Sequence, residues 1–177
     1  MFNADDPLAD YRSGSLEPWS VEILCSVVRA MRPSVVIETG TYLGLTTKKL
    51  IEAMDFFRGE KQCRIFTVEM DRDRASAAWE TLLHAGENCS LMVGDAIEFL
   101  ATFKGQADII FLDDDHTDKH VREEIRLALK ILRPGGVIFV HDVVGPFELD
   151  KVVKEYGGVI LELPRLHVAG GLGVITK

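Results

Sequence analysis

Residues 108–142 read DIIFLDDDHTDKHVREEIRLALKILRPGGVIFVHD. The stretch begins and ends with short apolar runs, 108–112 and 136–141, in which β-branched and aromatic residues dominate. Between them, apolar residues recur with a helical period over 118–132, and RPGG at 133–136 is expected to end that helix. Strands that are apolar throughout are typical of a parallel sheet covered on both faces. The stretch therefore predicts one strand–helix–strand unit with a right-handed crossover.

The same alternation extends in both directions along the chain. Strand-like runs at 35–38, 65–69 and 90–93 are separated by helix patterns at 43–54, 72–85 and 95–103. A helix is also expected from Pro18 onward and another near 147–156. The last two strands, 159–163 and 172–176, are too close for a crossover helix, so they should pair antiparallel. The prediction is an α/β fold: a doubly wound, Rossmann-like, seven-stranded sheet, mostly parallel, with one antiparallel strand near the C-terminus.

Length and charge limit the classes of function. At 177 residues, one domain is expected over 1–177, with a helical segment at 1–33, a central core at 34–142 and a terminal helix and strand pair at 143–177. The net charge of −8 argues against broad binding to nucleic acid or anionic membranes. No apolar run reaches the ~20 residues of a membrane span. The acidic N-terminal residues lack a signal pattern, so a cytoplasmic location is expected. The three cysteines show neither zinc spacing nor a disulfide framework.

Residues that could bind a ligand follow each of the first five strands. In an open α/β sheet, ligands bind beyond the carboxyl ends of the strands. The segments there are ETGTYLG at 38–44, Glu69, GDA at 94–96, DDDH at 113–116 and HD at 141–142. Gly40 and Gly44 would allow a tight turn and a close approach to a ligand. The first segment is neither a GxGxxG motif nor a P-loop, and it contains no basic residue that would suit a phosphate.

In this order, ETGTYLG, TVEMD, GDAIEFL, DIIFLDDDH and LRPGGVIFVHD resemble the class I S-adenosylmethionine-dependent methyltransferases over about residues 34 to 142. The chain is most similar to the metal-assisted O-methyltransferases, the catechol, caffeoyl-coenzyme A and cephalosporin-hydroxylase-like group. The resemblance implies S-adenosylmethionine as cofactor and a small-molecule acceptor, with methyl transfer to a hydroxyl oxygen. Neither nucleic acid nor a membrane is expected as a partner. A second subunit could help to close the site, as in a homodimer.

The resemblance also implies the cofactor contacts. They are, in chain order, Thr39, Gly40, Thr41, Glu69, Met70, Gly94, Asp95, Ala96 and Asp113, with Glu38 and Gly44 shaping the first loop. Gly40 and its threonine neighbours would lie against the methionine part, and Asp113 near its amino group. Glu69 would hold the ribose hydroxyls, with Met70 beside the adenine and Asp95 at its edge. The alternative for Glu69 is a solvated carboxylate in the first turn of the next helix.

The metal-dependent relatives place one Asp after the fourth strand and an Asp-Asn pair after the fifth. Asp113 and Asp142 match the two carboxylates, which would suit Mg²⁺ or Mn²⁺. Val143 stands where the relatives have Asn, so the third ligand stays open between His116, Asp114 and His141. This departure keeps open a second function, a non-catalytic protein that binds the cofactor or a partner. An NAD-type oxidoreductase is less favoured because the third glycine and the phosphate donors are missing.

His116 stands where the catechol-type enzymes have a lysine base. The hypothesis is that His116 takes the proton of an acceptor hydroxyl held on the metal, because neighbouring carboxylates raise the pKa of a histidine. The alternative is a solvated acidic loop over 113–116. His141 is expected to point to the opposite face from Asp142.

The other polar residues carry weaker expectations. Arg165 and His167 lie between the last two strands, at the edge where an acceptor could enter. Arg165 could meet an anionic group of the acceptor, and the alternative is a solvated loop. His84 and His120 are expected to be ordinary helix residues.

Overall fold

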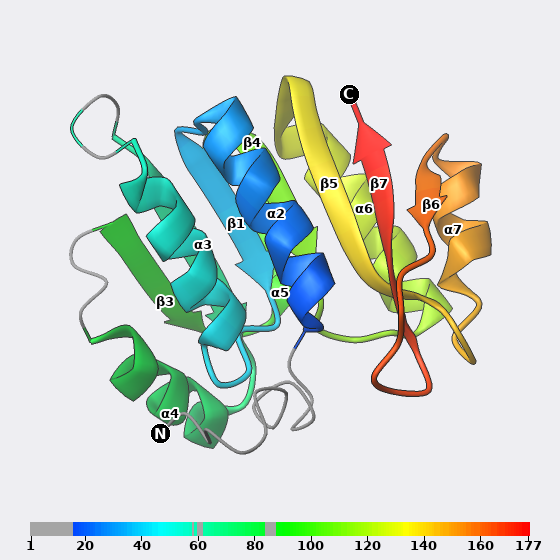
Figure 1. The fold of residues 1–177 in the computed structure, drawn as a ribbon, viewed down its shortest axis with the longest axis horizontal. Helices are drawn as coiled ribbons and strands as arrows, with labels where there is room; N and C mark the ends of the chain where they lie inside the picture. Colours follow the sequence, from blue (N-terminus) through cyan, green and yellow to red (C-terminus); the bar gives the residue numbers. More distant parts are fainter. Residues whose placement is uncertain (1–15, 58, 60–61, 84–87) are drawn as a thin grey trace.

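The computed structural model describes residues 16–57, 59, 62–83 and 88–177, and within them seven strands form one sheet in the order β3-β2-β1-β4-β5-β7-β6 (Figure 1). The strands are β1 Val35–Thr39, β2 Arg64–Glu69, β3 Cys89–Val93, β4 Ala107–Leu112, β5 Leu132–Val144, β6 Val159–Leu161 and β7 Gly170–Thr176. β7 pairs antiparallel with both β5 and β6, and the other neighbouring pairs are parallel. The predicted seven-stranded sheet with one reversed strand is confirmed.

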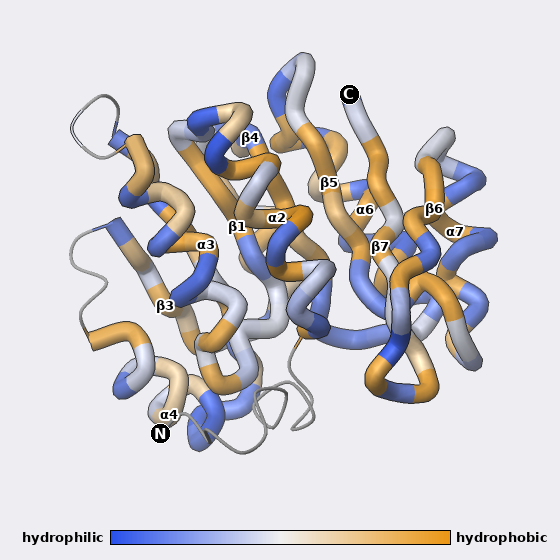
Figure 2. Tube along the Cα trace, in the orientation of Figure 1, coloured by the Kyte–Doolittle hydropathy of each residue, from blue (hydrophilic) through white to orange (hydrophobic). Residues whose placement is uncertain are grey.

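Helices cover both faces of this sheet. They are α2 Pro18–Met31, α3 Leu45–Asp55, α4 Arg72–Leu82, α5 Ala96–Thr102, α6 Asp118–Ile131 and α7 Leu149–Glu155. One core packs α2, α3 and the end of α4 on one face, and a second packs α5, α6 and α7 on the other (Figure 1). Figure 2 shows that the central strands are apolar along most of their length. All six residues of β4 are buried, as the continuous apolar run predicts.

Several element boundaries differ from the prediction. β5 begins at Leu132, which pairs with Ala107, so the segment expected to separate helix and strand belongs to β5. Gly135, within that segment, donates its N–H to the Lys177 carbonyl at 2.7 Å. The helix predicted over 72–85 ends at Leu82, and residues 84–87, with His84, lie outside the described residues. The first half of the predicted 1–33 helical segment also lies outside them.

The strand order places the switch point at β1. From β1, the chain builds β2 and β3 on one side of the sheet and β4 and β5 on the other. The loops that follow these five parallel strands therefore meet at one edge of the sheet, where such folds bind ligands. Of the helices described, none is both long enough and apolar enough to cross a bilayer.

Candidate functional site

A cavity of about 530 Å³ lies at the carboxyl ends of the parallel strands. The residues lining it that the sequence predicts as site residues are Gly40, Thr41, Glu69, Met70, Gly94, Asp95, Ala96, Asp113, His116 and Asp142. The predicted residues Glu38, Thr39 and Gly44 do not line it. The cavity thus gathers residues from five separate loops.

Gly40 allows two of these loops to lie in contact. Its φ is +79°, and a Cβ there would lie 2.2 Å from the carbonyl oxygen of Asp113. The close approach that requires glycine is therefore to the backbone after β4. Gly44, with φ +78°, lies instead against α4, where a Cβ would be 3.3 Å from the Ala78 carbonyl. For Gly44, the expected close approach to a ligand is replaced by packing between α3 and α4.

Glu38 lies beneath the loop that follows β1. Its side chain is fully buried and accepts hydrogen bonds from the hydroxyls of Thr47 and, at 2.6 Å, Thr67. Burial raises the pKa of Glu38 to about 7; the two threonine hydrogen bonds oppose this rise, and the charge of Asp113 adds to it. Thr41 Oγ1 lies 2.6 Å from Thr67 Oγ1 and continues the network. Glu38 thus connects the first loop to β2 and α3 without touching the cavity.

Glu69 is held by backbone groups at the end of β2. Only 7% of the residue is exposed. Its carboxylate accepts hydrogen bonds from the N–H groups of Tyr42 at 2.8 Å and Asp71 at 2.9 Å. Both oxygens keep a lone pair for a further donor. The carboxylate is therefore fixed in position at the cavity, rather than loosely solvated in the next helix.

The neighbouring loop leaves room beside Glu69. Apart from Gly94 itself and its two chain neighbours, no described residue has a heavy atom within 4 Å of the position that a Cβ would take at Gly94. Asp95 caps α5 by accepting the Glu98 N–H at 2.8 Å. Met70, 75% exposed, lines the same part of the cavity. This side of the cavity has an apolar surface and open space next to a fixed carboxylate.

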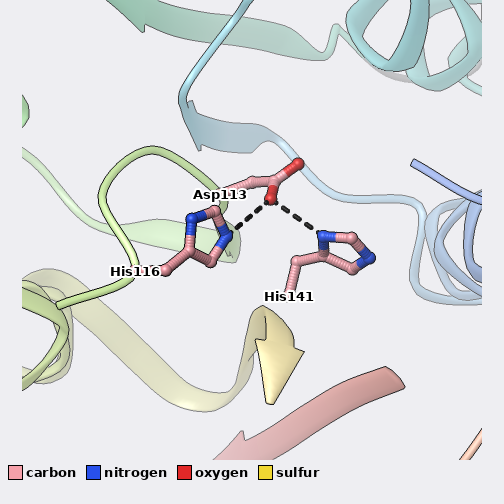
Figure 3. Close-up of side chains that lie close together, drawn as sticks. All are labelled: Asp113, His116 and His141. Carbon is pink, nitrogen blue, oxygen red and sulfur yellow. Dashed lines mark hydrogen bonds and ion pairs between the residues drawn. The ribbon is translucent and has the colours of Figure 1, made fainter. Parts of the chain in front are cut away.

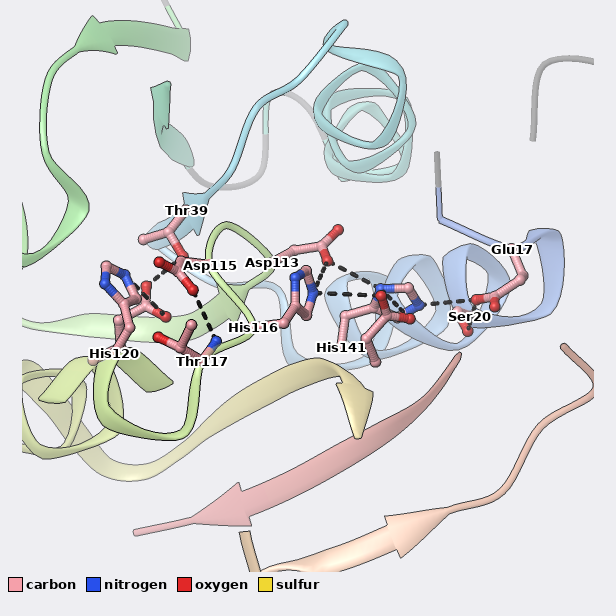
Figure 4. Close-up of polar contacts among 11 residues, drawn as sticks. Glu17, Ser20, Thr39, Asp113, Asp115, His116, Thr117, His120 and His141 are labelled. Carbon is pink, nitrogen blue, oxygen red and sulfur yellow. Dashed lines mark hydrogen bonds and ion pairs between the residues drawn. The ribbon is translucent and has the colours of Figure 1, made fainter. Parts of the chain in front are cut away.

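Alternating histidines and carboxylates form a chain on the other side of β1. Asp113 Oδ1 lies 3.0 Å from His141 Nδ1 and 3.4 Å from His116 Nε2 (Figure 3). His141 Nε2 lies 2.9 Å from Glu17 Oε2, so the chain runs from the cavity to the start of α2 (Figure 4). Asp142 approaches both imidazoles, at 3.5 Å from His116 Nε2 and 3.4 Å from His141 Nδ1. We refer to these five residues as the histidine–carboxylate chain.

Charge interactions between its members set the direction of the pKa shifts in the histidine–carboxylate chain. Burial lowers the pKa of His141, but Asp113, Glu17 and Asp142 outweigh it and raise the pKa to about 10. Burial also lowers the pKa of His116, and Asp113 and Asp142 again reverse the direction, so that this pKa is raised. Burial would raise the pKa of Asp113, but the two histidines hold it below its usual value. The predicted rise in the pKa of His116 has this physical basis.

The prediction that His141 and Asp142 point to opposite faces is wrong. Asp142 has a φ of +55°, and the pairing of β5 with β7 is irregular between His141 and Val144. A bulge of this kind interrupts strict alternation, so both side chains reach the same cluster. Val143 is completely buried in the core and does not line the cavity.

The model of a protein family described as a methyltransferase domain matches residues 37–143, close to the segment that carries the resemblance. The chain belongs to this family. This chain is 26% identical over 132 residues to catechol O-methyltransferase from Sus scrofa, with 71% of this chain and 68% of that protein covered. The match to catechol O-methyltransferase from Mus musculus, also 26% identical over 132 residues, covers 71% of this chain and 48% of the relative. The chain thus spans about half the length of that relative.

The fold comparison agrees. The O-methyltransferase TomG from Streptomyces achromogenes, solved in complex with SAM, superimposes with a TM-score of 0.75 at 20% identity. The superposition covers 92% of this chain and 82% of TomG. The predicted class I methyltransferase resemblance is therefore confirmed, and nothing favours the NAD-type oxidoreductase alternative.

Some residues of the candidate site carry no signal in the sequence. Glu17 precedes Pro18 and reads only as the start of a helix, yet it contacts His141, 124 residues away. Arg74 lies with its guanidinium carbon 5.3 Å from the centre of the Tyr42 ring, and both residues line the cavity. Such contacts depend on how α2 and α4 pack against the sheet.

Three weaker expectations have separate outcomes. His120, expected to be an ordinary helix residue, lines the cavity and lies 3.0 Å from Asp114. His167 lines the cavity as well. Arg165 does not, and its guanidinium donates to the Val168 carbonyl at 3.4 Å. Arg165, the residue expected to meet an anionic group of the acceptor, is thus not part of the cavity lining.

Proposed function

We propose that the protein transfers the methyl group of S-adenosylmethionine to a hydroxyl oxygen of a small molecule. The observation that carries the proposal is the arrangement of charged groups around one cavity. Glu69 stands at its β2 side, and the His116–Asp113 pair stands at its β4 side, with the Gly40 loop between them. A nucleoside and a reacting hydroxyl would need such groups at opposite ends of the same cavity.

The cavity suits the cofactor's chemistry. S-adenosylmethionine supplies a methyl group on a positively charged sulfur, which is already an activated leaving group. Among the described residues that line the cavity, Arg74 is the one with a permanent positive charge, whereas several are carboxylates. An acidic lining favours a sulfonium and an ammonium group over a phosphate. We assign the ribose hydroxyls to Glu69, whose carboxylate is preorganised by two backbone donors, and the adenine to the open space beside Gly94.

We assign the role of general base to His116. Its ring stacks on Phe147, with 5.3 Å between ring centres and 26° between planes, so the imidazole is held at the cavity. The acceptor hydroxyl would give its proton to His116 while the oxygen–carbon bond forms and the carbon–sulfur bond breaks. Asp113 and Asp142 would stabilise the imidazolium that results. Alignment of oxygen, methyl and sulfur by the cavity accounts for the rest of the catalysis.

The side chains at the cavity decide whether the metal that the resemblance implies would fit there. A divalent cation here would polarise the acceptor oxygen and favour loss of its proton. The carboxylates of Asp113 and Asp142 are present, but Val143 removes the third oxygen ligand from the cavity. The nearest other donors are the imidazoles of His116 and His141 and the carboxylate of Glu17, which lie within 4.8 Å of Asp113 or of Asp142. A mixed nitrogen and oxygen set suits Mn²⁺ better than Mg²⁺, so we propose Mn²⁺ for Asp113 and Asp142.

Labelled S-adenosylmethionine tests the activity. The purified protein is incubated with the tritiated cofactor and a panel of catechols, phenols and aliphatic alcohols, with and without Mn²⁺ or Mg²⁺. We expect labelled product, and a rate at least about 100-fold lower in His116→Ala, since a positioned base contributes about 10²–10⁴-fold. The variant should bind S-adenosylhomocysteine as the wild type does. Undiminished transfer by His116→Ala would refute the role of this residue.

The buried Val143 favours one alternative function, a protein that binds the cofactor without transferring its methyl group. Binding of S-adenosylhomocysteine without transfer to any member of the panel would support that alternative. A cytoplasmic location and closure of the cavity by a second copy of the chain remain predictions from the sequence.

A further inference from the structure

A second group of potential metal ligands lies beside the histidine–carboxylate chain. Asp114 comes from the loop after β4, and His120 and Glu124 lie four residues apart on α6. His120 Nε2 is 3.0 Å from Asp114 Oδ2 and 3.9 Å from Glu124 Oε2. In Figure 4, His120 and Thr39 lie at one end of the residues drawn, and His141 and Glu17 lie at the other. We call Asp114, His120 and Glu124 the α6 cluster.

The α6 cluster contains a buried acidic oxygen without a donor. Glu124 is 1% exposed, and one of its oxygens accepts the Thr39 hydroxyl at 2.7 Å. A carboxylate oxygen of Glu124 lies within 4.8 Å of one of Asp114. Oδ1 of Asp114 is buried and has no hydrogen-bond partner. Two carboxyl groups so close together, one of them buried, are stabilised by a shared proton, by an imidazolium at His120 or by a metal cation.

The geometry favours a cation. The three ligand atoms lie within 4.8 Å of one another. Protein ligands bind a first-row divalent metal at about 2.0–2.2 Å, which places neighbouring ligand atoms roughly 3–4 Å apart. The two measured separations already match that spacing. Asp114 and His120 also line the cavity, so water or another small ligand could complete the coordination. Two residues four apart on a helix present their side chains on one face, as a metal site requires.

We propose that the α6 cluster is a second divalent-metal site, separate from Asp113 and Asp142. Two carboxylates and one imidazole form a donor set for a first-row transition cation such as Mn²⁺, Co²⁺ or Zn²⁺, and they disfavour Mg²⁺. Through Glu124, the ion would connect to Thr39 at the end of β1. It would therefore join α6 to the two loops that meet at Gly40.

Metal binding to the full chain tests the proposal without any measurement of activity. The protein is stripped with a chelator and titrated with Co²⁺, with visible absorption and elemental analysis as readouts. Wild type should bind one ion more than His120→Ala or Glu124→Gln. The affinity for the ion at this site should fall at least about 100-fold. Mutating residues that only hydrogen-bond to a metal ligand already lowers metal affinity about 10–100-fold. Asp142→Asn should keep the ion of the α6 cluster.

His167→Ala is the matched control because it removes a cavity histidine that belongs to neither cluster. It should bind as many ions as the wild type. His120 is partly exposed, so its alanine variant keeps the test valid should Glu124→Gln not fold. Equal ion content and affinity in wild type, His120→Ala and His167→Ala would overturn the proposal. So would a wild type that binds no Co²⁺, and a shared proton or an imidazolium at His120 would then stabilise the two carboxyl groups.

Discussion

Replacing Glu38 by glutamine should make the protein more stable than wild type at about pH 8 and change little at about pH 4. Glu38 is fully buried, and its pKa in the folded protein is raised from 4.5 to about 7, chiefly by burial. A group whose pKa rises on folding contributes stability that is fully present below pH 4.5 and is lost as the pH rises to about 7. At about 1.4 kcal/mol per pKa unit, the difference corresponds to about 3 kcal/mol.

Urea denaturation at several pH values measures this difference. Glutamine keeps the shape of the side chain and an oxygen that can accept from Thr47 and Thr67, but it has no charge to desolvate. The free energy of unfolding of Glu38→Gln minus that of wild type should therefore rise by about 3 kcal/mol between about pH 4 and pH 8. Glu80→Gln, an exposed position on α4, is the matched control and should show a flat difference. A flat or falling difference for Glu38→Gln would refute the reasoning.

Four further substitutions test contacts in the site and in the core. Gly40→Ala should lower the free energy of unfolding, measured by urea denaturation, by about 3 kcal/mol or more, because its Cβ would meet Asp113 and its φ is positive. Gly94→Ala should leave the free energy of unfolding within about 0.5 kcal/mol of wild type but weaken S-adenosylhomocysteine binding, measured by calorimetry. Val143→Asn should destabilise the fold by about 3 kcal/mol without tightening Mn²⁺ binding, because position 143 faces the core. Asp108→Ala should cost about 3 kcal/mol, since this carboxylate accepts two backbone N–H groups at the start of β1. A loss below about 0.5 kcal/mol for Gly40→Ala or Asp108→Ala, or tighter Mn²⁺ binding by Val143→Asn, would contradict these assignments.

The architecture could be predicted because its signals are local. Each central strand is a continuous apolar run, and β4 was expected at 108–112 and lies at Ala107–Leu112. The short connection before β7 indicated the reversed strand. The carboxyl-end rule then placed most of the candidate residues around one cavity.

The remaining details depend on packing between distant segments. β1 continues to Thr39, whose hydroxyl therefore reaches Glu124 on α6 rather than the cavity. The positive φ of Asp142 has no signal in the sequence, because Asp is rarely in that conformation. Glu17 meets His141 only because α2 packs across the sheet. Thus the sequence identified the loops of the site but not the directions of several side chains within them.

The central claim is that the cavity binds S-adenosylmethionine through Glu69. Titration calorimetry with S-adenosylhomocysteine tests it most directly, on wild type, Glu69→Ala and the exposed control Glu80→Gln. We predict binding by wild type and by the control, and an affinity about 10- to 100-fold lower in Glu69→Ala, as expected for hydrogen bonds to a charged group. Equal affinity in all three proteins, or no binding by wild type, would contradict the account.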